Sequence, residues 1–158
     1  MNRSDPIVPT PAASIRVLIA EDHGSIREGI RVLLESERDF EVVGEAIDGR
    51  QAVEVALQVQ PSSIVMSSNL PGLSGIDATR QIMTTLPDTN VVILSADLEA
   101  PAINAARTSG ARGYVAKSGL LLQLPAVIRA LQNGTAYISM TRDSDVVPLP
   151  QPTAQTQR

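Results

Sequence analysis

The 158-residue chain contains no cysteine and no tryptophan, and it has a single histidine. Without cysteine, disulfide frameworks, thiolate metal sites and cysteine nucleophiles are excluded. Aromatic residues make up 2% of the chain and hydrophobic residues 43%, so the core must be built from valine, isoleucine, leucine and alanine. These are the residues of buried parallel strands and their covering helices. The composition therefore favours an α/β fold.

Basic residues are not in excess, because 13 lysines and arginines face 17 aspartates and glutamates, for a formal net charge of -4. This segment lacks the positive field that supplies most non-specific affinity for nucleic acids. Its apolar runs fall far short of the roughly 20 residues that a membrane span needs, and the first 14 residues lack the apolar core of a signal peptide. We expect a cytoplasmic protein, and we expect this segment to bind neither nucleic acid nor membranes.

Short apolar runs alternate with amphipathic stretches, which predicts strands at residues 17–20, 40–46, 64–66, 91–94 and 114–116, each followed by a helix. The fifth helix is predicted from about Pro125 to Gln132. Five such βα repeats indicate a flavodoxin-like, doubly wound, five-stranded parallel sheet of order 2-1-3-4-5. We expect the domain to span residues 15–139. Residues 1–14 and 140–158 are expected to be tails, the second with the proline-rich composition of a linker.

Polar side chains follow four of the predicted strands. Glu21 and Asp22 follow the first strand, Ser67 ends the third, Ser95 ends the fourth and Lys117 follows the fifth. Ligands bind at the carboxyl ends of strands in such sheets. Each residue alone is more often a cap or a turn residue, but their shared position at one edge predicts a functional site.

Several segments together resemble a receiver domain of the NarL/FixJ (LuxR-type) response regulators. They are IRVLIAEDH at 15–23, IREG at 26–29, VVGEA at 42–46, LPGLSG at 70–75 and SGARGYVAK at 109–117. The resemblance covers roughly residues 15–139. It implies two-component phosphorelay signalling, commonly in transcription regulation through an attached helix-turn-helix domain, which this chain does not show after Ser139.

The resemblance also implies a role for each polar residue at the sheet edge. Glu21 and Asp22 match the acidic pair that helps to hold Mg²⁺, and Asn69 falls where the family contributes a backbone carbonyl to the metal. Ser67 falls on the aspartate that accepts phosphate.

The remaining three matches concern the switch. Ser95 matches the hydroxyl residue after the fourth strand, Lys117 the family's lysine, and Tyr114 the switch aromatic. In the family, the lysine and the aromatic residue complete the switch.

Ser67 departs from the family where a carboxylate is needed. Ser62 is a second departure, since the family often has aspartate there, and two changes in one strand favour natural divergence. A serine hydroxyl needs a base within hydrogen-bond reach to become a nucleophile, and His23, the only histidine, is expected to be a loop or packing residue. Removing one carboxylate should weaken Mg²⁺ binding. We expect Lys117 to pair directly with Glu21 or Asp22 instead.

These observations predict a degenerate receiver that acts by protein–protein contact, is not an enzyme and requires no cofactor, with weak Mg²⁺ binding at most. The expected partners are a histidine kinase, an output domain or a second copy. Two alternatives stay open: a small-ligand sensor, and a receiver phosphorylated on Ser67.

A run of three leucines, Leu120 to Leu122, precedes the fifth predicted helix, and Pro125 is expected to delay the start of that helix. These leucines either pack inward or form an exposed apolar strip for self-association or partner binding.

Overall fold

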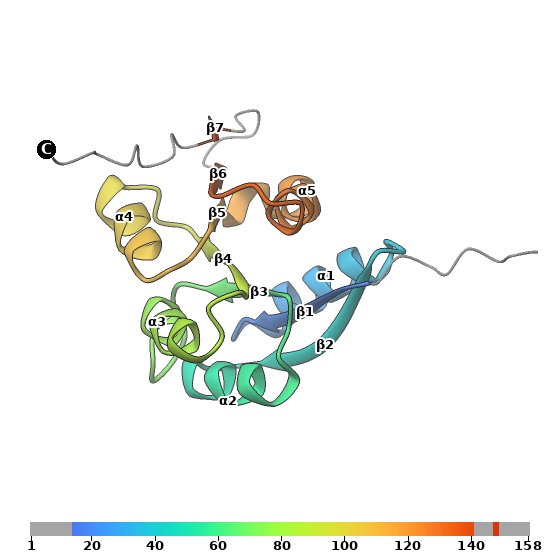
Figure 1. Cartoon of the computed structure of the whole chain (residues 1–158), viewed down its shortest axis with the longest axis horizontal. Coiled ribbons are helices and arrows are strands. Elements are labelled where there is room, and N and C mark those ends of the chain that lie inside the picture. The colour runs from blue at the N-terminus through green and yellow to red at the C-terminus, as the bar shows by residue number, and fades with distance from the viewer. Residues whose placement is uncertain (1–13, 141–146, 149–158) are drawn as a thin grey trace, which may run out of the picture.

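The computed structural model describes residues 14–140 and 147–148. Within them strands and helices alternate as the sequence predicts (Figure 1). The strands are β1 (Ile15–Ala20), β2 (Phe40–Ala46), β3 (Ser63–Ser67), β4 (Asn90–Ser95), β5 (Gly113–Ala116), β6 (Ile138–Met140) and β7 (Val147–Pro148). The helices are α1 (Gly24–Glu35), α2 (Gly49–Val59), α3 (Gly75–Thr85), α4 (Ala100–Thr108) and α5 (Leu120–Gln132), with a short 3₁₀ helix, η1 (Lys117–Gly119), before α5.

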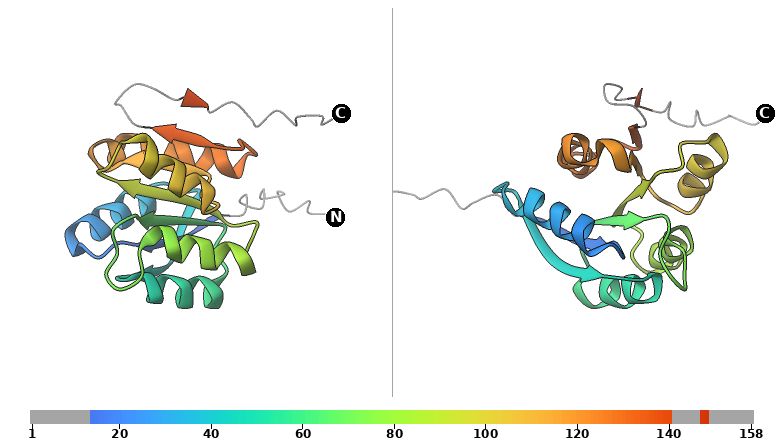
Figure 2. Two further views of the ribbon diagram at one scale, coloured as in Figure 1. Left: turned by 90° about the vertical axis from the view of Figure 1, so that its left-hand side faces the viewer. Right: turned by 180° about the vertical axis from the view of Figure 1, so that it is seen from behind.

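The first five strands are parallel and lie in the order β2-β1-β3-β4-β5, which confirms the predicted flavodoxin-like order. Helices α1 and α5 cover one face of the sheet, and α2, α3 and α4 cover the other (Figures 1 and 2). Among the helices of the described residues, none combines the length and hydropathy of a membrane-spanning segment.

The two layers of core follow from strand alternation, because successive side chains point to opposite faces. Ile19 and Val65 pack in the layer below α1 and α5, whereas Ala20 and Met66 pack in the layer below α2, α3 and α4. All four are fully buried. Continuing the same alternation by one residue turns Glu21 and Ser67 toward the α1 and α5 face.

The fifth helix begins at Leu120 and not near Pro125, so the predicted delay is wrong. Pro125 lies inside α5 and is buried. Proline disfavours a helix interior because it lacks a backbone N–H. Here Leu120, Leu124 and Val127 are buried at helical spacing, and their burial outweighs the local preference of one residue.

The sheet extends beyond the five predicted strands. β6 pairs in parallel with β5, and β7 pairs antiparallel with β6. The expected domain boundary at residue 139 therefore falls within β6. Tyr137, which precedes β6, is buried and lies under the guanidinium of Arg107 on α4, 5.1 Å from its ring centroid. Residues 1–13, 141–146 and 149–158 of the two expected tails lie outside the described part of the chain.

Candidate functional site

The sheet register brings the expected polar residues to one edge. Ala20 is opposite Met66, Ser67 is opposite Leu94, and Ser95 is opposite Ala116. Glu21, directly after Ala20, and Lys117, directly after Ala116, therefore stand at the same carboxyl edge as the two serines. The edge divides into an acidic side, formed by Glu21, Asp22 and Lys117, and a hydroxyl side, formed by Ser68 and Ser95.

Glu21 is the centre of the acidic side and is fully buried. Its Oε2 lies 3.5 Å from Lys117 Nζ, and its Oε1 lies 3.0 Å from Nδ1 of the exposed His23 ring. The backbone N–H of His23 also donates to Oε1, at 3.2 Å. A buried carboxylate is costly unless it is paired and hydrogen-bonded. The expected pairing of Lys117 thus falls on Glu21.

Asp22 and His23 complete a cluster of possible metal ligands with Glu21. One ligand atom from each lies within 4.8 Å of the others, and His23 Nδ1 is 3.4 Å from Asp22 Oδ1. Mg²⁺ prefers hard oxygen ligands in octahedral geometry. Here one ligand is an imidazole, the ammonium of Lys117 already faces Glu21, and residue 67 supplies no charge. These residues therefore fit Mg²⁺ poorly.

Ser67 ends β3 in a closed environment. The residue is fully buried, and its Oγ has no hydrogen-bond partner in the described part of the chain. The first residue of α3, Gly75, packs against it so closely that a Cβ there would stand 1.9 Å from the Ser67 carbonyl oxygen. Strand alternation points its hydroxyl toward the acidic side.

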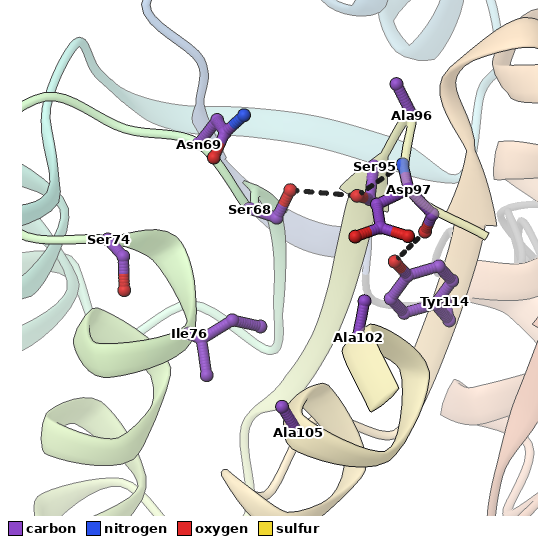
Figure 3. A pocket seen from close by; sticks show the side chains of 10 residues that line it. All are labelled: Ser68, Asn69, Ser74, Ile76, Ser95, Ala96, Asp97, Ala102, Ala105 and Tyr114. Atoms are coloured by element: carbon purple, nitrogen blue, oxygen red, sulfur yellow. Dashed lines mark hydrogen bonds between the residues drawn. The ribbon is translucent and has the colours of Figure 1, made fainter. Parts of the chain in front are cut away.

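Ser95 is the centre of the hydroxyl side (Figure 3). The Ser68 hydroxyl donates to Ser95 Oγ at 3.0 Å, and the backbone N–H of Asp97 donates to the same oxygen at 3.1 Å. The backbone carbonyl of Asp97 in turn accepts a hydrogen bond from the Tyr114 hydroxyl. Asp97 thus links the end of β4 to the aromatic ring of β5 through its main chain.

The phenol hydroxyl of Tyr114 stays protonated at neutral pH, because its pKa is raised above the ordinary value. Burial raises the pKa of its phenol, the neighbouring Ser95 hydroxyl lowers it, and the charge of Asp97 raises it further. Because burial disfavours the phenolate, Tyr114 stays neutral and remains a hydrogen-bond donor to Asp97.

A cavity of about 550 Å³ opens beside Ser95, on the α3 and α4 side of the edge. We call it the α4 cavity. It is lined by Ser68, Asn69, Ser74, Ile76, Ser95, Ala96, Asp97, Ala102, Ala105 and Tyr114.

The expected site residues therefore fall into two groups. Glu21, Asp22 and Lys117 lie together on the acidic side, whereas Asn69, Ser95 and Tyr114 line the α4 cavity. Ser67 does not line the α4 cavity, and its hydroxyl makes no hydrogen bond within the described residues.

Sequence reasoning missed Ser68 and Asp97. Strand alternation offered a signal for Ser68, since the residue after Ser67 must turn to the opposite face, where Ser95 has its hydroxyl. Asp97 contributes two main-chain groups to the hydroxyl side, and main-chain contacts leave no mark in the residue type.

The chain was compared with known protein families, sequences and structures. Residues 17–132 match the family model of the response regulator receiver domain. The transcriptional regulatory protein LiaR of Bacillus subtilis is 34% identical over 120 residues, which cover 76% of this chain and 57% of LiaR. The uncharacterized transcriptional regulatory protein YxjL of the same organism is 40% identical over 134 residues, which cover 84% of this chain and 61% of YxjL.

A solved structure with a similar fold is a LuxR-family two-component response regulator from Aurantimonas sp. SI85-9A1. It superposes with a TM-score of 0.76 at 32% identity, over 83% of this chain and 92% of that one. The match to LiaR and YxjL spans about three fifths of their lengths.

Proposed function

Because this chain belongs to the response regulator receiver domain family of two-component systems, we propose that it is an atypical receiver that signals without forming an aspartyl phosphate. The observation that carries the proposal is the buried hydroxyl of Ser67 at the end of β3, beside a buried Glu21 whose charge Lys117 already matches. The phosphate-accepting position lacks the carboxylate that would serve as nucleophile in phosphoryl transfer.

The chemistry of an alcohol supports this proposal. A carboxylate is a nucleophile at neutral pH, whereas a serine hydroxyl must lose a proton to a base within hydrogen-bond reach. The only histidine, His23, already has its Nδ1 3.0 Å from Glu21. Ser67 has no partner within the described residues that would take its proton. The lack of such a base also counts against a phosphoserine at residue 67.

Mg²⁺ has no required role in this proposal. Both oxygens of the Glu21 carboxylate already have a neighbour, since Oε2 faces Lys117 and Oε1 contacts His23. A divalent cation would have to displace the lysine and would gain only Asp22 as a second carboxylate. We therefore expect weak Mg²⁺ binding at most.

The signal is proposed to pass through protein contacts, in transcription regulation. Family membership supports a histidine kinase or an output domain as partners, and the relatives that match are named as transcriptional regulatory proteins. The match covers 57% of LiaR and 61% of YxjL, so the rest of each of these two proteins is long enough for a further domain. The contacts proposed here require no nucleic-acid binding by residues 14–140.

An apolar strip at the start of α5 offers one such contact. Leu120 packs inward, but Leu121 is 62% exposed and Leu122 is 82% exposed. Together with Ile26 and Gly29 of α1 they line a cavity of about 500 Å³. Of the two readings of the leucine run, inward packing holds for Leu120 alone. We propose that Leu121 and Leu122 contact a second copy of the chain, since exposed apolar groups next to a hollow mark interaction sites.

The proposal is tested by incubating the chain with acetyl phosphate and Mg²⁺, followed by intact-mass analysis. We expect no phosphorylated species, while a receiver with an aspartate at this position, treated alongside, gains one phosphoryl group. A phosphate on any residue of this chain that is removed by hydroxylamine would overturn the proposal.

A further inference from the structure

The α4 cavity has no part in the function proposed above. Its volume of about 550 Å³ falls within the roughly 300–1,000 Å³ of small-molecule sites. It lies at the carboxyl ends of β3 and β4, the edge at which open α/β sheets bind their ligands. Both its size and its place in the fold are therefore those of a binding site.

The cavity is mainly apolar on the side of the helices and mainly polar at the strand ends (Figure 3). Ile76, Ala102 and Ala105 lie on the side of α3 and α4, whereas Ser68, Asn69 and Ser95, together with Ala96, lie at the ends of β3 and β4. Most of these side chains are small, which is why the space stays open. A molecule with an apolar body and hydrogen-bonding groups on one side matches such walls.

The charge of the cavity is negative. Asp97 is the one acidic residue among its lining, and none of the lining residues is a lysine or an arginine. The Asp97 residue is exposed, and its Oδ1 accepts a hydrogen bond of 2.9 Å from the backbone N–H of Glu99. Tyr114 is neutral. The electrostatics therefore oppose an anion such as phosphate and favour a cation.

We propose that the α4 cavity binds a small organic cation, an amine that carries a short apolar body. The ammonium group pairs with Asp97 and hydrogen-bonds the nearby hydroxyls, and the apolar body lies on Ala102 and Ala105 of α4. This site is separate from the acidic side, because Glu21, Asp22 and Lys117 do not line it.

The occupied cavity would act on the segment between β4 and α4. Ser68 and Ser95 form one wall, α4 forms the other, and the main chain of Asp97 bonds both Ser95 and Tyr114. A ligand that contacts both walls holds this segment against β5 and restricts the movement of α4. Binding therefore offers a control that does not pass through residue 67.

The test uses a pair of probes that share a phenol ring and differ in charge, tyramine and 4-hydroxyphenylacetate. Each is titrated into the ¹⁵N-labelled chain while amide shifts are followed. Tyramine should give saturable shifts at Ser68, Asp97 and Ala102, with a dissociation constant in roughly the millimolar range, as expected for so small a ligand. The dissociation constant of 4-hydroxyphenylacetate should be at least about tenfold higher.

Three variants locate the site. Asp97→Asn keeps an oxygen that can accept a hydrogen bond from Glu99 but removes the charge. It should therefore reduce the ratio of the dissociation constants of 4-hydroxyphenylacetate and tyramine at least about fivefold. Ala102→Leu fills the cavity and should abolish binding. The control is Asn104→Leu, on the same helix but outside the lining, which should bind tyramine as the wild type does.

Equal binding of both probes, no saturable shift at about 10 mM tyramine, or wild-type affinity in Ala102→Leu would overturn the proposal. The spectra report the folding of each variant in the same experiment. If Ala102→Leu fails to fold, Asp97→Asn still tests the proposal, because it changes no packing volume. No step of the test involves Ser67 or phosphate. Its failure would therefore leave the phosphate-independent signalling proposed above untouched.

Discussion

Lys117 Nζ lies 3.5 Å from Oε2 of Glu21, a carboxylate that is fully buried. The lysine side chain keeps 23% of its surface exposed. The pair joins the end of β5 to the end of β1, across β3 and β4, and it places a positive charge in the middle of the sheet edge. Its loss would leave an uncompensated charge in the interior.

We predict that Lys117→Met destabilises the fold by at least about 2 kcal/mol. Removing one partner of a buried pair costs roughly 3–5 kcal/mol, and the partial exposure of Lys117 reduces this. The free energy of unfolding is measured in urea. Adding Glu21→Gln to Lys117→Met should recover most of the loss, because no buried charge then remains.

The matched control for this prediction is Arg80→Met. Arg80 pairs with Asp77 on the surface, where both side chains are more than half exposed, and exposed pairs contribute about 0–1 kcal/mol. If Lys117→Met costs no more than Arg80→Met, the pair with Glu21 does not stabilise the fold.

A second prediction concerns the pH dependence of the ion pair between Asp39 and Arg129. Arg129 Nε lies 2.7 Å from Asp39 Oδ2, and the hydrogen bond from Arg129 lowers the pKa of Asp39 below its ordinary 3.8. A lowered carboxyl pKa stabilises the folded state above the ordinary value, and this stability is lost as the pH falls through the lowered pKa.

Asp39→Asn should therefore lower the free energy of unfolding at pH 7 and lower it by less at about pH 3, below the ordinary pKa of 3.8. The loss should be about 1 kcal/mol or less, because both side chains are more than a third exposed and water screens the pair. Urea unfolding at the two pH values measures it. A difference between Asp39→Asn and wild type that stays constant with pH would contradict the prediction.

Much of the fold follows from the sequence, because β1, β3, β4 and β5 are buried almost throughout and leave continuous apolar runs, while the edge strand β2 is only partly buried. The run at residues 40–46 coincides with β2. The start of α5 was not predictable from local preference, since burial of Leu120 and Leu124 decides it. β6 has only three residues, and its place beside β5 depends on a contact distant in the chain.

The candidate site was predicted in its residue positions but not in its geometry. Register alone brings Glu21, Ser95 and Lys117 to one edge. Whether a side chain there faces a cavity or is covered depends on the loops above it. The sequence placed Ser67 at the ligand-binding edge of the sheet but did not indicate that its side chain is fully buried there.

A third prediction tests the exposed leucines of α5. Leu121→Lys should reduce self-association, because it places a charge in an apolar contact, while the free energy of unfolding changes by about 0.5 kcal/mol or less, since the side chain is exposed. Sedimentation velocity over a range of concentrations measures the effect. Leu57→Lys, on α2 at the opposite face of the sheet and also partly exposed, is the matched control.

Two results would end this idea. One is a wild-type chain that stays monomeric at high concentration and whose binding of a kinase or an output domain is unaffected by Leu121→Lys. The other is an equal loss of association in Leu57→Lys, which would show that added charge and not the strip is responsible.

The fourth prediction is that Ser67→Asp restores Mg²⁺ binding and some phosphorylation. The new carboxylate joins Glu21 and Asp22 on the acidic side, so three oxygen ligands and a nucleophile are present together. Without metal this variant should be less stable than the wild type, because a buried carboxylate beside Glu21 adds like-charge repulsion and desolvation. Lys117 can relieve part of that cost.

Mg²⁺ should then stabilise Ser67→Asp by mass action, since it binds the folded state alone, by about 2.7 kcal/mol at one hundred times the dissociation constant. The measurement is a set of melting curves with and without millimolar Mg²⁺. Ser67→Asn is the matched control, because asparagine has nearly the size of aspartate without its charge. It should be destabilised by crowding but should show no rise with metal. If Ser67→Asp shows no metal-dependent rise beyond that of Ser67→Asn and the wild type, residue 67 is not the group that the acidic side lacks, and the assignment of Glu21 and Asp22 as metal ligands is wrong.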